Sequence, residues 1–212
     1  MADDPSDVLR LLRRAGSGDA AALGELFARH RARLRRMVEL RLDGRLQARV
    51  DPSDVIQEAY LEVAGRLADY LRDPKLPFFL WLRLVVGEQL VNLHRRHVGA
   101  QMRDPRREVA LFRDALPQAS SAALAAQLLG KITSPSEAAV RAERLLRLQE
   151  AVNGLDPLDR EVLALRHFEQ LSRAETARAL GVTEAAAAKR YVRALKRLKD
   201  VLAHMPGGLE GL

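Results

Sequence analysis

Residues 172–199 read SRAETARALGVTEAAAAKRYVRALKRLK, and this stretch sets how the rest of the chain is interpreted. Ser172 and Glu175 have the spacing of a capping box, in which a hydroxyl and a carboxylate satisfy the first free amides of a helix. Gly181 supplies the backbone freedom that ends this helix, and Thr183 can cap the next one. The stretch therefore predicts a short helix, a tight turn and a long second helix.

The second helix of this pair is apolar on one side and cationic elsewhere. The apolar residues recur at helical spacing and should face inward: Ala187, Tyr191, Ala194, Leu195, Leu198, Val201 and Leu202. The basic residues lie away from that stripe: Lys189, Arg190, Arg193, Lys196, Arg197 and Lys199. A helix-turn-helix whose second helix has this character fits the major groove of DNA. The pattern favours DNA binding over an ordinary helical hairpin with a solvated basic face.

Composition excludes several classes of protein. The 212 residues carry a net charge of +7, spread along the chain, which suits a nucleic-acid binder without proving one. The absence of cysteine excludes disulfides, thiol catalysis and thiolate metal sites. The start of the chain lacks the pattern of a signal peptide, and no run approaches the ~20 apolar residues of a membrane helix. We therefore expect a cytoplasmic protein without membrane insertion.

The chain reads as helix nearly throughout, which predicts an all-α fold. Asp4, Asp51, Ser134 and Asp156 each precede a proline and then an acid, the pattern of a capped helix start. Helices are expected over residues 5–15, 19–42, 52–71 and 78–102, followed by further helices after residue 134. We expect two helical domains, at residues 1–104 and 135–205, joined by a linker at 105–134 and followed by a tail at 206–212.

Three segments carry a resemblance to a known family. They are DPSDVIQEAYLEV (51–63), FFLWLRLVVGEQLVNLHRRHV (78–98) and LDPLDREVLALRHFEQLSRAETARALGVTEAAAAKRYVRALKRLK (155–199). In this order and spacing they resemble a bacterial RNA polymerase sigma factor of the sigma-70 family, extracytoplasmic-function (ECF) group. The resemblance implies a first domain like sigma region 2, which binds the polymerase clamp and the −10 promoter element. It implies a second domain like sigma region 4, which reads the −35 element.

The resemblance also implies the function and its partners. The protein should bind core RNA polymerase and promoter DNA and direct promoter recognition and transcription initiation. An anti-sigma factor, the usual regulator in that group, is left open as a further partner. The sequence does not decide whether the linker enters the polymerase cleft or is autoinhibitory.

The helix over residues 52–71 carries a candidate protein interface. Its members lie largely away from the core stripe, at i, i+3, i+4 and i+7: Asp54, Gln57, Glu58 and Leu61. Acids and an amide around an exposed leucine are typical of an interface patch. The resemblance implies that these positions dock on a basic coiled coil of the largest polymerase subunit.

The helix that starts at residue 78 should carry promoter opening. The candidate contacts around the −10 element are Phe78, Phe79, Arg83, Glu88, Asn92, Arg95, Arg96 and His97. Phe78, Phe79 and Trp81 could stack on unpaired bases, although core packing is favoured for Trp81. Glu88 stands where family members often have an asparagine for a flipped base, which leaves the −10 preference open.

Readout of the −35 element should rest on few side chains. Residues 185–188 are four alanines, and alanine reaches at most a thymine methyl. The candidate contacts are Thr183, Glu184, Lys189, Arg190 and Arg193, with Lys196 and Arg197 on phosphates. We expect a helix that positions the protein well and discriminates bases weakly.

Other functions find less support in the sequence. His94 and His97 have the spacing of a metal-binding pair but lack a third ligand, so we expect no metal site. The sequence contains no catalytic or cofactor-binding motif, so we expect no cofactor and no enzymatic activity. One alternative is a free-standing dimeric helix-turn-helix regulator that binds a palindromic operator without polymerase. Another is an adaptor that joins proteins and would tolerate loss of Arg190 and Arg193.

Overall fold

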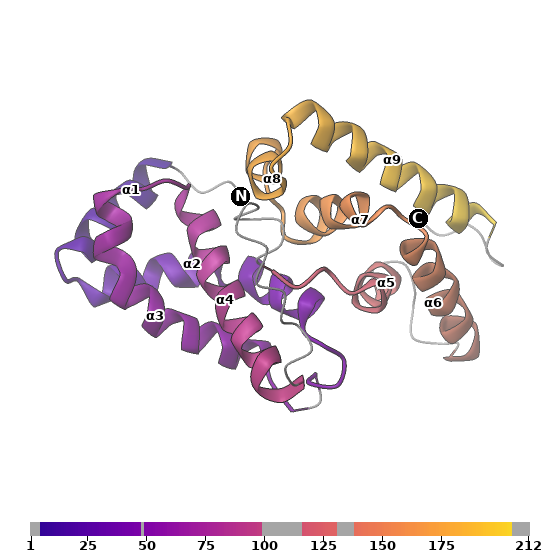
Figure 1. The fold of residues 1–212 in the computed structure, drawn as a ribbon, viewed down its shortest axis with the longest axis horizontal. Helices are drawn as coiled ribbons and strands as arrows, with labels where there is room; N and C mark the ends of the chain where they lie inside the picture. The colour runs from indigo at the N-terminus through magenta and orange to yellow at the C-terminus, as the bar shows by residue number, and fades with distance from the viewer. Residues whose placement is uncertain (1–4, 48, 99–115, 131–137, 205–212) are drawn as a thin grey trace.

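The computed structural model describes residues 5–47, 49–98, 116–130 and 138–204 (Figure 1). These residues form α1 (Pro5–Gly16), α2 (Ala20–Arg41), α3 (Pro52–Arg72), α4 (Phe78–Val98), α5 (Ser121–Gly130), α6 (Ala138–Asn153), α7 (Pro157–Leu163), the π-helical turn η2 (Ala164–Phe168), α8 (Arg173–Leu180) and α9 (Glu184–Ala203). The described residues contain no strand, so the all-α prediction is confirmed.

Helices α1 to α4 form the first bundle, and their predicted starts are confirmed where the structure describes them. Asp19 caps α2 by accepting from the backbone amide of Ala22, and Asp51 caps α3 by accepting from that of Ser53. Leu26 and Leu34 from α2 are fully buried in one apolar core with residues from the other three helices. This core fixes the outward faces of α3 and α4.

Helices α5 to α9 form the second bundle, which contains the predicted helix-turn-helix. The Ser172 hydroxyl accepts from the Glu175 amide at 3.1 Å, and the Glu175 carboxylate accepts from the Ser172 amide at 2.7 Å. Gly181 ends α8 with φ at 63°, and the Thr183 hydroxyl accepts from the Ala186 amide at 3.2 Å. The local signals in the sequence therefore produce the turn that they predict.

Among the described side chains of the predicted inner stripe of α9, which leave out Leu202, one differs from expectation. Ala187, Ala194 and Leu198 are buried, but Leu195 is 38% exposed, so its assignment to the inner stripe is wrong. It follows Ala194 and so lies about 100° further round the helix, at the edge of the buried face.

The segment expected to be a linker contains helix α5, which packs along α6. Just before it, the Ser120 amide donates to the Leu40 carbonyl at 2.7 Å, and the Ala119 amide donates to Glu161 at 3.3 Å. These bonds join the start of α5 to both bundles. The predicted end of the fourth helix at residue 102 and the tail at 206–212 lie outside the described residues, and the domain limits stay a prediction.

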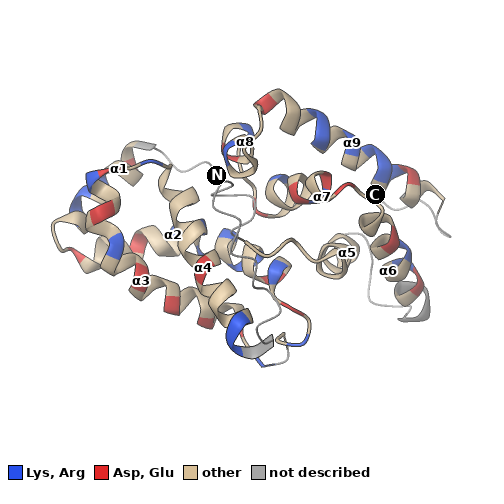
Figure 2. Cartoon of the chain, viewed as in Figure 1, with Lys and Arg blue, Asp and Glu red and all other residues tan. Residues whose placement is uncertain are grey.

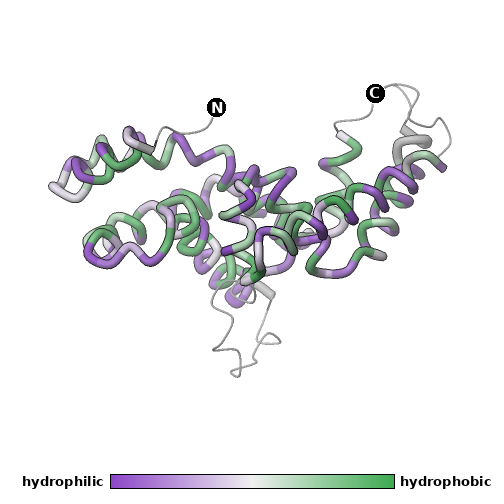
Figure 3. The backbone as a smooth tube through the Cα atoms, turned by 90° about the horizontal axis from the view of Figure 1, so that it is seen from above, coloured by the Kyte–Doolittle hydropathy of each residue, from purple (hydrophilic) through white to green (hydrophobic). Residues whose placement is uncertain are grey.

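The two bundles lie next to each other along the longest axis of the molecule (Figures 1 and 3). Helix α2 of the first bundle contacts η2 and α5 of the second. Val162, Leu165 and Leu171 belong to the same apolar cluster as the core of the first bundle. Among the described helices, none combines the length and the apolarity that crossing a membrane requires.

Candidate nucleic-acid interface

Lysine and arginine residues recur along α9 of the second bundle (Figure 2). The exposed ones are Lys189, Arg193, Lys196, Arg197 and Lys199. Because Ala187, Ala194 and Leu198 face the bundle, these cations point toward solvent or along the sides of the helix. A row of cations on a helix-turn-helix can contact the phosphates of duplex DNA.

Two arginines of α9 are held by α7. Arg193 donates to both carboxylate oxygens of Asp159, with Nε–Oδ2 at 2.5 Å and Nη2–Oδ1 at 2.7 Å. Arg190 donates to Asp159 at 2.7 Å and to Asp156 at 3.2 Å. The pairing orients both guanidinium groups toward the start of α7.

Asp159 is the buried member of this group. Burial by itself would raise the pKa of Asp159, but the hydrogen bonds from Arg193 and Arg190 outweigh burial and lower it. From the sequence, this residue was assigned to a helix-starting motif, and its contact with α9 was not predicted. The signal that could have indicated the contact is an acid in the first turn of one helix and a second helix rich in arginine. The carboxylate therefore remains charged against the two arginines.

The start of α9 presents short side chains. Thr183 and Glu184 are exposed, and the Thr183 hydroxyl already accepts the capping bond from Ala186. Ala185 is exposed, whereas Ala187 is buried against the bundle. A major groove would therefore meet few groups able to read base edges at this end of the helix.

Phe78 and Phe79 are core residues, which corrects the expectation that their rings are open for stacking on bases. Each is 5% exposed. The Phe78 ring lies against Tyr70 and Trp81, with ring centroids 5.8 Å from each. The Phe79 ring is covered by the Arg33 guanidinium at 3.5 Å. Trp81 itself stacks on Tyr70 at 4.4 Å, in agreement with its expected packing role. The start of α4 is so apolar that the first bundle buries it.

Arg83 is also buried, at 4% exposure, and does not lie on an open surface of α4. Its Nε donates to Glu169 of the second bundle at 2.6 Å. The assignment of Arg83 as an exposed DNA contact is therefore corrected for this conformation. The sequence offered no sign of the partner, which lies 86 residues further along the chain.

The second half of α4 is more open. Arg95 and Arg96 are exposed, and Asn92 is half-buried. Glu88 accepts from Arg66 at 2.6 Å, so its carboxylate is paired within the bundle. The side chain of His97 lies outside what the structure describes. His94 is buried, accepts from the Asp43 amide at 3.2 Å, and has its pKa lowered by burial.

The predicted patch on α3 is brought together on one surface. Asp54, Gln57, Glu58 and Leu61 are all exposed, and Leu61 is 73% exposed. Val55, Ile56 and Ala59 face the core from the same turns of the helix. We call these four exposed residues the α3 patch. A leucine surrounded by acids suits a protein surface with an apolar centre and basic side chains.

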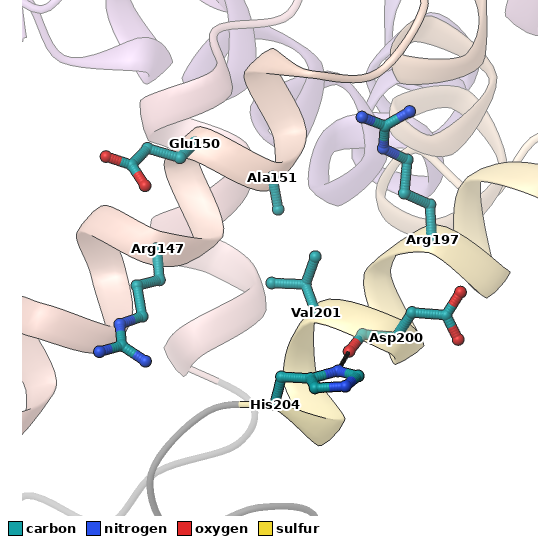
Figure 4. Close-up of a pocket in the computed structure, with 7 residues that line it drawn as sticks. All are labelled: Arg147, Glu150, Ala151, Arg197, Asp200, Val201 and His204. Carbon is teal, nitrogen blue, oxygen red and sulfur yellow. Dashed lines mark hydrogen bonds between the residues drawn. The ribbon is translucent and has the colours of Figure 1, made fainter.

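A shallow pocket between α6 and α9 has no evident chemistry (Figure 4). It is lined by Arg147, Glu150, Ala151, Arg197, Asp200, Val201 and His204. The His204 ring bonds to the Asp200 carbonyl at 2.6 Å, so the histidine is engaged locally. In the described part of the chain, no group of three or more His, Cys, Asp or Glu residues could hold a metal ion.

Comparisons with known proteins agree with this arrangement. A family model described as Sigma-70, region 4 matches residues 145–198, which run from α6 into α9. The ECF RNA polymerase sigma factor SigD of Mycobacterium tuberculosis is 31% identical over 186 residues, covering 88% of this chain and 79% of SigD. RNA polymerase sigma factor NccH of Alcaligenes xylosoxydans xylosoxydans is 30% identical over 199 residues, covering 94% and 96%. A solved structure of CnrH in complex with the cytosolic domain of CnrY has a TM-score of 0.53 at 24% identity, covering 92% and 96%, and supports the fold alone.

Proposed function

The chain belongs to the extracytoplasmic-function group of RNA polymerase sigma factors, and we propose on that premise how its surfaces divide the work of transcription initiation. A sigma factor directs core RNA polymerase to promoter DNA. The observation that carries our proposal is that the region matched as Sigma-70 region 4 folds as a helix-turn-helix with a basic α9. The polymerase performs the chemistry, and we assign no catalytic step and a cytoplasmic site of action to this chain.

The α3 patch is the proposed docking surface for core polymerase. Its exposed Leu61 can enter an apolar site on the partner, and Asp54 and Glu58 can pair with basic side chains around that site. Most of the binding energy of an interface comes from a few central residues. Leu61, the apolar member of this patch, and Gln57, four residues before it on the same face, should dominate its affinity.

The two DNA surfaces are proposed on opposite bundles. In the second bundle, Lys189, Arg190 and Arg193 in the middle of α9 would contact the −35 element, while Lys196 and Arg197 contact phosphates. In the first bundle, Asn92, Arg95 and Arg96 on the open half of α4 would contact the −10 element. Arg83 can join them only when its bond to Glu169 is broken.

A protein regulator is a further part of the proposal. CnrH has been solved in complex with the cytosolic domain of CnrY. By analogy, we propose that an anti-sigma factor could bind this chain and compete with polymerase. When added to the purified chain, such a partner would weaken its binding to core polymerase.

The test is direct binding of the purified full chain to bacterial core RNA polymerase. We expect Gln57→Ala/Leu61→Ala to weaken binding by about tenfold, equivalent to ~1.4 kcal/mol. Asp69→Ala is the matched control, because Asp69 is an exposed acid further along the same helix and outside the patch. Failure of the folded wild-type chain to bind core polymerase would reject the proposal. Specific binding to a palindromic operator without polymerase would favour a free-standing regulator.

A further inference from the structure

Two arginines of the first bundle and two glutamates of the second are buried together where the bundles meet. Arg83 of α4 donates to Glu169 at 2.6 Å and lies 3.6 Å from Glu161. Arg41, at the end of α2, donates to both glutamates. The side chains of Arg41 and Glu169 are fully buried. We call these four residues the interdomain charge cluster, and its two positive and two negative charges balance.

The chain that follows η2 adds a row of acceptors beside this cluster. Arg36 donates to the Phe168 carbonyl at 3.3 Å. Arg33 donates to the carbonyls of Glu169 at 3.0 Å and Gln170 at 3.3 Å. Gln170 has φ at 58°, a left-handed conformation that is uncommon outside glycine and turns its carbonyl with the others. Three successive carbonyls thus face arginines of α2.

Buried charge pairs affect the stability of an interface differently from apolar contacts. Burial by itself would raise the pKa of Glu169, but the charges of Arg41 and Arg83 outweigh burial and lower it. Loss of one member leaves an uncompensated buried charge, which destabilises strongly, whereas the intact pairs add little net stability because both partners are well hydrated when separated. The cluster therefore fixes one docked arrangement and still permits the bundles to part.

The face of α2 and α4 that the second bundle covers carries basic side chains that could contact DNA. Arg83 lies on α4 between its buried start and its exposed basic half, and the Arg33 guanidinium lies over the Phe79 ring. The groups that cover these arginines are carboxylates and carbonyls, which are hydrogen-bond acceptors only, as phosphate oxygens are. Glu169 and the turn 168–170 therefore occupy positions that a nucleic-acid backbone could occupy after opening.

We propose that Glu161 and Glu169 form an autoinhibitory contact that closes the second bundle over the basic face of α2 and α4. In the closed form Arg83 is withheld from DNA, and separation of the bundles frees it. The link to promoter DNA rests on the proposed function, whereas the closed arrangement itself does not.

The test measures the distance between the bundles in the free full-length chain. The sequence has no cysteine, so Ala64→Cys on α3 and Leu146→Cys on α6, both exposed positions outside the cluster, give specific sites for a donor and an acceptor dye. Glu169→Gln keeps the shape of the side chain and removes its charge. We expect this variant to raise the ratio of open to closed molecules by about tenfold, corresponding to ~1.4 kcal/mol. Glu150→Gln, an exposed acid on α6, is the matched control.

A second variant separates opening from misfolding. Arg83→Met/Glu169→Met removes one cation and one anion together and leaves the Arg41 and Glu161 pair. We expect it to return to the closed efficiency, because no unpaired buried charge remains. Fluorescence of the single tryptophan, Trp81, and circular dichroism report whether each variant keeps the first bundle folded.

The outcomes are distinct. Energy transfer that falls in Glu169→Gln and recovers in the double variant supports the proposal. Unchanged transfer in a folded Glu169→Gln, or equal loss in Glu150→Gln, overturns it. A wild-type chain that is closed by this measure but cannot bind core polymerase would count against the proposed function and leave only the closed interdomain contact supported.

Discussion

At the residue scale, one carboxylate connects the start of α7 to the recognition helix. Asp159 accepts three hydrogen bonds from Arg190 and Arg193 while its side chain is almost fully buried. The neighbouring Asp156, which also accepts from Arg190, is about half exposed and caps α7. Replacing Asp159 should therefore destabilise the fold more than replacing Asp156.

We expect Asp159→Asn to lower the free energy of unfolding at pH 7 by about 2 kcal/mol, since it replaces hydrogen bonds between charged groups with weaker ones. The pKa of Asp159 is lowered in the folded protein from the ordinary 3.8, so its contribution is complete above that value and is lost as the pH falls through the lowered pKa. Urea unfolding at pH 7 and at about pH 3 should show the difference between wild type and variant shrinking with acid.

Asp200→Asn is the control for this prediction, because Asp200 is an exposed acid on α9. It should leave the unfolding free energy within about 0.5 kcal/mol of wild type at both pH values. A deficit in Asp159→Asn that stays constant from pH 7 to acid would show that the carboxylate charge is not its cause.

At the element scale, the caps and turns that bound the helices could be predicted from the sequence. Which side of some helices is buried could not. The capping box at Ser172 and the turn at Gly181 depend on neighbours in sequence, and both form as expected. The start of α4 is apolar on every side, so its periodicity could not show that Phe78 and Phe79 point into the bundle. The π-helical turn η2 has no sequence signature that would separate it from the end of α7.

The turn between α8 and α9 allows a clean test of backbone conformation. Gly181 has φ at 63°, and a Cβ added there would meet no atom within 4 Å. Gly181→Ala should therefore destabilise the protein by about 1–2 kcal/mol through the left-handed backbone alone. Gly65 in α3 also has open space around it but has helical backbone, so Gly65→Ala should stabilise by about 0.5–1 kcal/mol.

If thermal unfolding shows that Gly181→Ala lowers the stability and Gly65→Ala raises it, the positive φ of Gly181 is the cause of the difference. A Gly181→Ala chain as stable as wild type would mean that the turn can rearrange, and the fixed angle between α8 and α9 would then lose its support.

At the scale of the whole molecule, the sequence predicted two bundles but not how they meet. Arg41 and Glu169 are 128 residues apart, and Arg41 and Glu161 are 120 apart. In the sequence each looks like an ordinary surface charge, and no local pattern pairs them. The segment that forms helix α5 was assigned to the linker, yet its start bonds to both bundles. Long-range charge pairing of this kind is decided by tertiary packing.

The closed arrangement treats the two DNA surfaces unequally. Lys189 and Lys196 on α9 are exposed while the bundles are closed, whereas Arg83 on α4 is buried. The apparent affinity of a site that exists only in the open form is reduced by the open fraction. If closed molecules outnumber open ones by ~10 to 1 and Glu169→Gln shifts that ratio to ~1 to 1, the variant should bind a single-stranded −10 oligonucleotide about fivefold more tightly. Binding of a −35 duplex should stay unchanged.

Fluorescence anisotropy with the two labelled DNAs at one fixed salt concentration measures both affinities. In Arg83→Ala/Glu169→Gln, the gain for the single strand should be smaller than in Glu169→Gln, because opening then exposes the arginines of α2 without Arg83. If Glu169→Gln tightened the duplex and the single strand equally, the cause would be the removal of one negative charge from the protein. The unequal response therefore distinguishes the uncovering of a surface from a general change in charge.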